Sequence, residues 1–345
     1  MSKKDPDVAG RYFLYVSLND ADALVVYHMD PQTGALANRG KVKVGSRPGA
    51  QTIDVAGRFL YVAIRDEYTV ATCAIDGKTG ALTLRGATPV VDEAVYLAID
   101  RTGRYLLTAY FQAGKAAVYP IQADGTIGNQ ATVVLDGFKD PHSIQSDPTN
   151  RFVYIPDPNA CKILQYSFNQ QDGTLSPAAS TQIVTENENP RHFWFHPSLN
   201  VVYFVNENSN SVMAFRRDAS NGALTAFQTL STLPPDYTGD SKCAHIELLP
   251  EGRFLYASNR GHDSLAIYSV DAADGKLAFL SHQPTEKKPR SFTIDPTGRF
   301  LYSAGQDSGK MTAYRIDQNN GSLQPLASYD VGPGPSWVQM LRLPA

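Results

Sequence analysis

A turn segment that reads Asp-x-x-Gly-Arg-Phe-Leu-Tyr recurs along this chain of 345 residues and constrains its fold more than any other feature. A second marker, a glycine followed by a small residue and Leu or Ile, falls between neighbouring copies at steps of 46, 45, 48, 49, 53 and 46 residues. Because two independent markers share one period, we infer one supersecondary unit that is repeated seven times. The turn copies are Asp7–Tyr15 (one residue longer), Asp54–Tyr61, Asp100–Leu107, Asp147–Tyr154, His196–Tyr203, Leu249–Tyr256 and Asp295–Tyr302, and the glycines of the second marker are Gly34, Gly80, Gly125, Gly173, Gly222, Gly275 and Gly321.

Each unit is predicted to be a small antiparallel sheet. Short runs rich in Val, Ile, Tyr and Phe flank the Gly-Arg turns, as Ser291–Ile294 and Phe300–Ser303 do in the last copy. Asp-Pro-Thr-Gly between such runs favours a hairpin, because Pro presets φ and Gly accepts a left-handed conformation. Asn-Gly and Asp-Gly pairs mark a second hairpin in the same unit, and no stretch shows apolar residues at helical spacing. Four short strands per repeat predict an all-β fold, a seven-bladed β-propeller that forms one domain over residues 1–345.

The two ends of the chain are predicted to complete one blade together. The N-terminal part supplies three strands, Tyr12–Leu18, Leu24–His28 and 35–44, and the C-terminal part supplies one, Ser336–Leu341. Pairing between them would close the ring by hydrogen bonds and leave neither terminus as an open sheet edge. We expect residues 1–10 to form a flexible tail.

Composition narrows the classes of partner and compartment. A net charge of −3 and the absence of a basic stripe argue against binding of nucleic acid. Cys73, Cys161 and Cys243 lie in different repeats at no metal-like spacing, which indicates buried thiols in a reducing compartment. No apolar leader and no membrane-spanning run is visible. We therefore expect a soluble, cytoplasmic protein, a monomer or weak homo-oligomer, with no metal, membrane or nucleic-acid partner.

Propeller geometry predicts where chemistry would take place. The strand before each Gly-Arg turn is the innermost of its blade, and its start lies beside the end of the strand that follows the turn. These positions from all blades therefore meet at one mouth of the central channel. Arginines there suit the carboxylate or phosphate oxygens of an anionic small molecule, and a histidine or glutamate can transfer a proton. The ionisable residues at these positions are Arg65, His142, Arg191, Glu207, Arg260 and Arg290.

Several of these positively charged and histidine side chains also allow structural interpretations. Each arginine could simply pair with an acid of the neighbouring blade. His192 precedes an aromatic run and is interpreted as a core residue, whereas His245 could equally line the channel or pack; His196 and His262 are assigned structural or solvated roles. The arginines of the repeated turn recur in blade after blade and are interpreted as scaffold; they are Arg58, Arg104, Arg151, Arg253 and Arg299.

The longest repeat carries about seven extra residues, which fall in the segment Leu233–Lys242. This segment enters the first strand of its blade, so it should lie on the same face as the charged cluster. Tyr237 and Lys242 could contact an anionic ligand there, and we hypothesise that the loop walls or covers the pocket. An ordinary surface insertion is the alternative, because loops tolerate added residues.

Four segments carry a family resemblance that extends from Tyr12 to Leu341. They resemble the bacterial seven-bladed 6-phosphogluconolactonases and, equally, the related fungal 3-carboxy-cis,cis-muconate lactonizing enzymes. The resemblance implies an active site of one histidine, two arginines and one glutamate, matched here by His142, Arg191, Arg260 and Glu207, and no metal or organic cofactor. The segments are Pro141–Ser143, Pro190–Pro197, Val205–Asn208 and Ser258–Arg260.

Three functions are compatible with these residues. The first, which we favour, is a lactonase of carbohydrate metabolism, acting on 6-phosphogluconolactone in the pentose phosphate pathway. The second is a carboxymuconate lactonizing enzyme, an intramolecular lyase, and the third is a non-enzymatic propeller that binds a ligand or protein. In the lactonase hypothesis either His142 or Glu207 transfers the proton. The additional substrate-binding candidates are Arg65, Arg290, His245, Tyr237 and Lys242.

Overall fold

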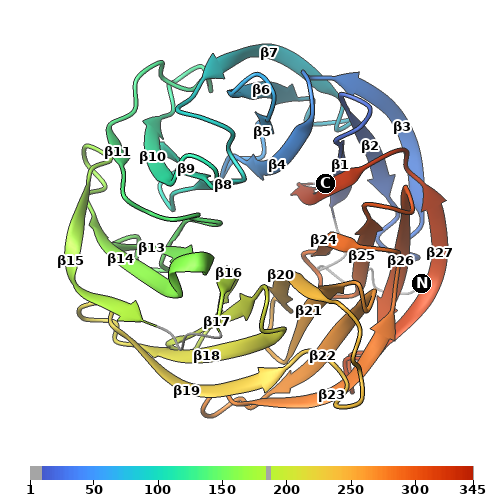
Figure 1. Ribbon diagram of the computed structural model, residues 1–345. Coiled ribbons are helices and arrows are strands. Elements are labelled where there is room, and N and C mark those ends of the chain that lie inside the picture. Colours follow the sequence, from blue (N-terminus) through green and yellow to red (C-terminus); the bar gives the residue numbers. More distant parts are fainter. Residues whose placement is uncertain (1–9, 184–187, 345) are drawn as a thin grey trace.

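Seven four-stranded antiparallel sheets are arranged in a ring around a central axis (Figure 1). The computed structural model describes residues 10–183 and 188–344. The all-β, seven-bladed propeller predicted from the repeats is confirmed. The predicted N-terminal tail lies outside the described residues except for Gly10.

Each blade runs from an innermost strand at the axis to an outermost strand at the rim (Figure 1). The first three blades, listed from the axis outwards, are β28 (Pro335–Leu343), β1 (Arg11–Leu18), β2 (Ala23–Met29) and β3 (Leu36–Lys43); β4 (Pro48–Ile53), β5 (Phe59–Ile64), β6 (Thr69–Ile75) and β7 (Leu82–Pro89); and β8 (Tyr96–Ile99), β9 (Tyr105–Tyr110), β10 (Lys115–Pro120) and β11 (Val133–Leu135). The next two are β12 (Gln145–Ser146), β13 (Phe152–Asp157), β14 (Lys162–Phe168) and β15 (Leu175–Ile183); and β16 (Pro190–Phe195), β17 (Val201–Asn206), β18 (Ser211–Arg217) and β19 (Leu224–Ser231). The last two are β20 (Lys242–Leu248), β21 (Phe254–Arg260), β22 (Ser264–Val270) and β23 (Leu277–Pro284); and β24 (Pro289–Ile294), β25 (Phe300–Gly305), β26 (Lys310–Ile316) and β27 (Leu323–Asp330).

The ring closes through the blade that the two ends of the chain share. The C-terminal strand β28 pairs antiparallel with β1, with Val16 opposite Val338 and Tyr12 opposite Arg342. The predicted pairing of the termini is thereby confirmed, although β28 is longer than the sequence indicated. Its last residue, Leu343, is buried in the apolar cluster between this blade and the next, which explains the extension.

The two sequence markers are joined to each other across blade boundaries. The tyrosine that ends the turn segment donates a hydrogen bond to the carbonyl of the marker glycine in the next blade, so each blade is tied to its neighbour. Leu107 replaces the tyrosine in one blade, and there Thr132 donates to the carbonyl of Gly173 at 2.8 Å instead. The tyrosine pairs are Tyr15–Gly80, Tyr61–Gly125, Tyr154–Gly222, Tyr203–Gly275, Tyr256–Gly321 and, across the closure, Tyr302–Gly34.

The repeated turn is held by its own aspartate and arginine. In the last copy, Asp295 accepts hydrogen bonds from the backbone N–H groups of Arg299 and Phe300 at 2.8 and 2.7 Å. The guanidinium of Arg299 lies over the ring of Phe300, 5.5 Å from its centre, which is a cation–π distance. Arg58, Arg104, Arg151 and Arg253 stack in the same way on the aromatic residue that follows them, so these arginines serve the scaffold.

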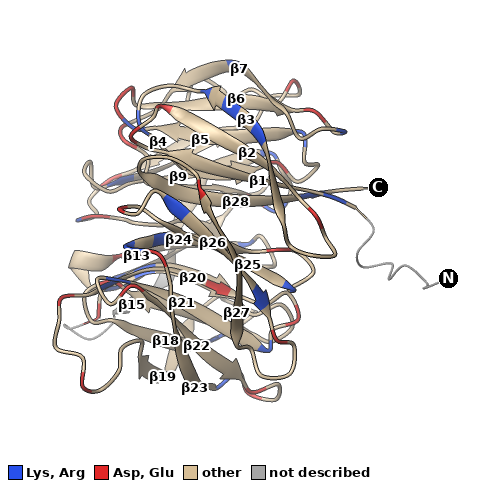
Figure 2. Ribbon diagram, turned by 90° about the vertical axis from the view of Figure 1, so that its right-hand side faces the viewer, with Lys and Arg blue, Asp and Glu red and all other residues tan. Residues whose placement is uncertain are grey.

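The hydrophobic core lies between neighbouring blades rather than at one centre. Apolar side chains of adjacent sheets interdigitate in separate clusters, such as the one that joins Phe13 and Leu24 to Leu60 and Val62. Seen from the side, acidic and basic residues are interspersed over the part of the ring that Figure 2 shows. The axis is thus left to the innermost strands, whose side chains decide what the channel contains.

Candidate active site

Two of the arginines occupy β-bulges at the start of innermost strands. In the β16–β17 ladder Pro190 lies opposite Asn206 and His192 lies opposite Val205, which leaves Arg191 without a partner. The β24–β25 ladder skips Arg290 in the same way, between Pro289 and Ser291. Bulges redirect a side chain and are common beside active sites. The sequence placed both arginines at the strand start, but it gave no sign of the bulges.

One carboxylate joins two of the predicted site arginines. Glu207 follows β17, and its Oε1 accepts a hydrogen bond from the Nη2 group of Arg260 in the neighbouring blade. The Nε atom of Arg191 lies 3.6 Å from the same oxygen. Arg191 is 1% exposed, and its Nη1 group donates to the carbonyl of Ala244 in β20. The three predicted residues are therefore brought together where two blades meet.

The arginines shift the pKa of their neighbours. Burial by itself would raise the pKa of Glu207, but attraction to Arg191 and Arg260 outweighs it, so the pKa lies below its usual value. Burial, followed by repulsion from Arg260 and Arg65, lowers the pKa of Arg290 to about 10. Arg290 therefore still carries its charge at neutral pH, and the carboxyl of Glu207 is ionised.

Arg290 differs from the other arginines because its charge is not matched. Within residues 10–183 and 188–344, its guanidinium has no hydrogen-bonded or ion-paired partner. Arg65, by contrast, forms an ion pair with Glu93. This agrees with the alternative interpretation, in which the arginine pairs with an acid and has a structural role. Among the described residues, Arg191 and Arg260 thus share Glu207 and Arg290 has no acid of its own, so these three positive charges outnumber the one carboxylate that pairs with them.

His142 lies against this cluster in the segment before β12. Its ring packs edge-on against Phe111 at 5.4 Å and against His192 at 5.3 Å between ring centres. Burial, followed by repulsion from Arg191 and Arg290, lowers the pKa of His142 well below 6.5. The imidazole is therefore neutral at physiological pH and can accept a proton.

A pair of aspartates that the sequence reasoning missed holds the segment of His142 in place. Asp157, at the end of β13, accepts hydrogen bonds from the backbone N–H groups of Lys139 and Asp140 at 2.9 and 3.0 Å. Asp140 in turn accepts one from the N–H of Asn159 at 2.8 Å. Burial and the shared hydrogen bond with Asp157 raise the pKa of Asp140 to about 7. The only sequence signal was an acidic residue just before the Pro-His pair.

Aromatic rings close the channel beneath the arginines. We call Tyr96, His192, His245 and Trp337 the aromatic floor; their ring centres lie 5.1 to 6.0 Å apart in contacting pairs. His192 is 2% exposed, so the interpretation as a buried residue is confirmed. On the arginine side, a recess of about 20 Å³ is bounded by Arg65, Arg191, Arg290 and the floor residues His192 and Trp337.

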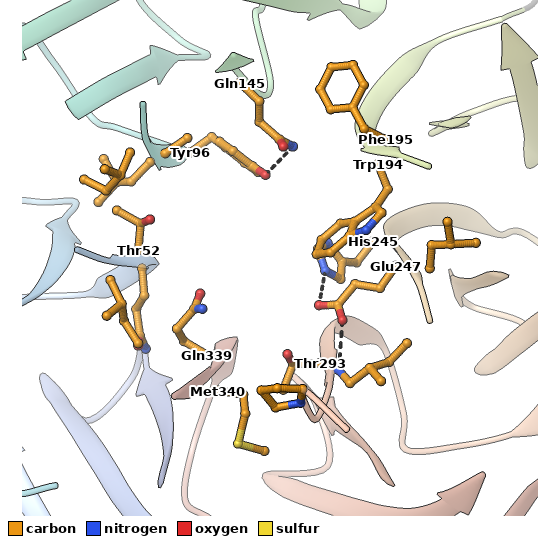
Figure 3. A pocket seen from close by; sticks show the side chains of 18 of the residues that line it. Thr52, Tyr96, Gln145, Trp194, Phe195, His245, Glu247, Thr293, Gln339 and Met340 are labelled. Atoms are coloured by element: carbon orange, nitrogen blue, oxygen red, sulfur yellow. Dashed lines mark hydrogen bonds and ion pairs between the residues drawn. The ribbon is translucent and has the colours of Figure 1, made fainter. Parts of the chain in front are cut away.

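On the other side of the floor the channel widens into a cavity of about 650 Å³, which we call the opposite cavity (Figure 3). His245 lines this cavity rather than the recess, and His192 stands between it and Arg191. Contact between His245 and the substrate stays a prediction. Most of the other lining side chains are apolar; the uncharged polar ones include Gln51, Thr52, Gln145, Thr293 and Gln339, and Asp100 and Arg101 add charged groups.

Of the two candidates from the inserted loop, Lys242 is joined to the arginine cluster through its backbone, because its carbonyl accepts a hydrogen bond from Nε of Arg260 at 3.4 Å. The ring of Tyr237 packs edge-on against His262 at 4.7 Å between ring centres, and its hydroxyl donates to the carbonyl of Asp240 at 3.1 Å. Lys242 is exposed and lies opposite Arg260 in the β20–β21 ladder, so the loop reaches the same face. Roles for Tyr237 and Lys242 as substrate contacts stay predictions.

Two further properties concern cofactors and membranes. Among the described residues, no three His, Cys, Asp or Glu side chains are grouped so that they could hold a metal ion. The same residues include no helix long and apolar enough to cross a membrane.

Comparison with known proteins identifies the family. The model of the family described as "Lactonase, 7-bladed beta-propeller" matches residues 8–97 and 90–340. The chain belongs to this lactonase family. Within the family it is similar to the 6-phosphogluconolactonase of Pectobacterium carotovorum, with 38% identity over 237 residues, which is 68% of this chain and 71% of that protein.

Two further proteins with lower sequence identity extend the likeness. The 6-phosphogluconolactonase of Bacillus subtilis is 32% identical over 197 residues, or 55% of this chain and 56% of that protein. Among solved structures, the periplasmic gluconolactonase of Pseudomonas aeruginosa superposes with a TM-score of 0.89 at 26% identity and covers 97% of this chain and 100% of its own. The likeness to that structure thus spans nearly the whole propeller.

Proposed function

We propose that this protein hydrolyses an anionic sugar lactone, 6-phosphogluconolactone, to the open-chain acid 6-phosphogluconate. The observation that carries the proposal is the unmatched positive charge of Arg191, Arg260 and Arg290 against the single Glu207. Guanidinium groups bind phosphate oxygens through paired hydrogen bonds, and a cation without a protein partner is available for this. The relatives named 6-phosphogluconolactonase support the same substrate.

The chemistry assigned to these residues is the addition of water to the lactone carbonyl, followed by cleavage of the ring C–O bond and protonation of the released oxygen. His142 is proposed to take the proton of the attacking water, because its neutral form is the one present at neutral pH. Glu207 is instead engaged by Arg191 and Arg260, so its carboxylate is assigned to orienting the two arginines. The two arginines would stabilise the negative charge that develops on the carbonyl oxygen.

The dimensions of the mouth suggest how a substrate would lie. The recess of about 20 Å³ has room for an oxygen-sized group, comparable to one water molecule. An oxygen of the substrate would fill it and meet Arg290, while the sugar ring would lie above it in the open mouth. The opposite cavity is larger, but its charged lining residues are two acids, Asp100 and Glu247, and one arginine, Arg101, so it suits an anion less well.

The proposal is tested by measuring acid release at constant pH with purified protein and three compounds: 6-phosphogluconolactone, unphosphorylated gluconolactone and 3-carboxymuconate. We expect the highest kcat/KM with the phosphorylated lactone, after spontaneous hydrolysis is subtracted. A preference for unphosphorylated gluconolactone would contradict the proposal that Arg191, Arg260 and Arg290 bind the phosphate group. Lactone formation from carboxymuconate, without hydrolysis of either sugar lactone, would make the protein a lactonizing enzyme instead.

We also propose that the protein works in the cytoplasm. The thiols of Cys73 and Cys243 are free and buried, which agrees with a reducing compartment. Because the gluconolactonase of Pseudomonas aeruginosa is described as periplasmic, cell fractionation is the direct test. Recovery of the protein in the periplasmic fraction would exclude the cytoplasmic assignment.

A further inference from the structure

A line of hydrogen bonds crosses the aromatic floor and connects the arginine cluster to the opposite cavity. Nη1 of Arg191 lies 3.2 Å from Nε2 of His192. Nδ1 of His192 lies 2.9 Å from Nδ1 of His245, and Nε2 of His245 lies 3.1 Å from Oε1 of Glu247. The other carboxylate oxygen of Glu247 accepts the backbone N–H of Ile294 at 2.8 Å. Figure 3 shows the last two contacts at the wall of the opposite cavity.

The direction of every hydrogen bond in this line is fixed by its two ends. A guanidinium can only donate, so Nε2 of His192 must accept. Burial and the neighbouring Arg191 lower the pKa of His192 well below 6.5, so the ring is neutral and its single proton sits on Nδ1. That proton is donated to Nδ1 of His245, whose own proton must then sit on Nε2 and point to Glu247. Both carboxylate oxygens of Glu247 then accept, one from Nε2–H of His245 and the other from the backbone N–H of Ile294, which completes the line without conflict.

We propose that Glu247 is a positioning residue for the candidate active site. Its carboxylate selects the tautomers of His245 and His192 that present an acceptor to Arg191, and it thereby helps to hold that guanidinium beside Glu207. The inference rests on the proposed function only in so far as Arg191 acts on substrate. Glu247 is 6% exposed and separated from Arg191 by two imidazole rings, so it acts through them and does not touch the lactone.

Replacing the carboxylate of Glu247 by an amide reverses the donor and acceptor roles along this line of hydrogen bonds. In Glu247→Gln the side chain has one acceptor for two donors, the N–H of His245 and the N–H of Ile294. The backbone N–H cannot change, so the amide oxygen is drawn to Ile294 and the NH₂ group faces His245. His245 must then carry its proton on Nδ1, His192 must accept there, and Nε2–H of His192 meets the N–H of Arg191. Two donors face each other, and Arg191 loses a hydrogen bond.

The first experiment measures tautomers and needs no substrate. Long-range ¹H–¹⁵N spectra of ¹⁵N-histidine-labelled protein distinguish protonated from unprotonated ring nitrogens, with His192→Asn and His245→Asn used to assign the signals. We expect Nδ1–H on His192 and Nε2–H on His245 in the unsubstituted protein, and the opposite pair in Glu247→Gln. The opposite tautomers in the unsubstituted protein would overturn the proposal, even if Glu247→Gln did not fold.

The second experiment measures turnover with the matched variant Gln339→Met. Gln339 lines the same cavity, but no hydrogen bond joins its side chain to this line in the described part of the chain. We expect kcat/KM on 6-phosphogluconolactone to fall about tenfold in Glu247→Gln, as for loss of one hydrogen bond to a charged group, and to be unchanged in Gln339→Met. Equal turnover of Glu247→Gln and the unsubstituted protein would refute the positioning role. Absence of lactone hydrolysis in the unsubstituted protein would refute the proposed function. The tautomer spectra would still decide whether Glu247 determines the tautomers of His245 and His192.

Discussion

Arg191 and Glu207 approach each other from the two strands of one hairpin, with Nε of the arginine 3.6 Å from Oε1 of the glutamate. The bulge at Arg191 makes this possible, because it frees the side chain from the alternation of β16. The same oxygen of Glu207 also binds Arg260, so one anion orients two cations. Predictions about activity follow from this shared carboxylate.

Arg191→Ala should cost about 2–5 kcal/mol in transition-state stabilisation, because it removes a buried charge and leaves Glu207 with a single partner. The quantity to measure is kcat/KM on the phosphorylated lactone, together with the melting temperature. Arg253→Ala is the matched control, since that turn arginine stacks on Phe254 and pairs with Glu251, far from the Glu207 cluster in the sequence repeat. If Arg191→Ala hydrolyses the lactone at the normal rate, Arg191 has a structural role and no role in catalysis.

Arg290→Leu should raise KM for 6-phosphogluconolactone about tenfold or more, as for loss of a hydrogen bond to a charged group of 1.5–3 kcal/mol. Turnover of unphosphorylated gluconolactone should change little, because this lactone has no phosphate group for Arg290 to bind. Arg65→Leu serves as the comparison, and a smaller effect is expected because Arg65 is already paired with Glu93. Equal losses on both substrates in Arg290→Leu would contradict a phosphate contact.

His142→Gln should lower kcat by roughly 10²–10⁴-fold, the usual contribution of a general acid or base. Glu207→Gln should lower kcat/KM as well, but through loss of the ion pairs that orient Arg191 and Arg260. Single-turnover rates across pH separate the two roles. A proton-transfer role for Glu207 would be indicated if His142→Gln retained full kcat.

The stability of the protein should decrease as the pH falls below 6.5. Burial lowers the pKa of His142 and His192 in the folded state, so the unfolded chain binds their protons first. Each histidine then lowers the free energy of unfolding by about 1.4 kcal/mol per pH unit below that value, whereas Asp140, whose pKa is raised to about 7, offsets one of the two, so a net slope of about 1.4 kcal/mol per pH unit is expected. Urea unfolding from pH 7.5 to 5.5 measures the slope. In His142→Gln the slope should be smaller, and an unchanged slope would exclude His142 as a contributor.

The stability of the closed ring should depend on the last strand, β28. Deletion of residues 336–345 removes nearly all of β28 and exposes the edge of β1, so the whole propeller should lose stability. Tyr302→Phe is a milder test, because it removes only the hydrogen bond across the closure and should cost about 0.5–1.5 kcal/mol. Tyr256→Phe removes the equivalent bond between two internal blades. A truncated protein that melts at the parent temperature would contradict the closure argument.

Much of the fold could be predicted because its determinants are local and repeated. Asp, Gly and Arg of the turn make contacts within five residues of one another, so their period reveals the blade directly. The marker glycines show the same regularity; at Gly34, with φ +75°, a Cβ atom would come within 2.4 Å of Phe300 in the adjoining blade. The positions of Arg191, Glu207 and Arg260 could also be predicted, because a residue that the repeat does not require stands out against it.

Tertiary structure alone decided which of these side chains meet. Whether an arginine is paired depends on residues from other blades or distant loops, as with Glu93 for Arg65, and Arg290 is set apart only because no such partner lies beside it in the described chain. His192 and His245 are 53 residues apart in sequence, and nothing in the repeat indicated that their rings share a hydrogen bond. The sequence alone therefore determined the blades and the mouth that carries the charges, because both arise from short-range, repeated contacts. The pairing of the charges and the line through the aromatic floor were decided by the closed ring, because they arise between side chains that the chain brings together only when all the blades are in place.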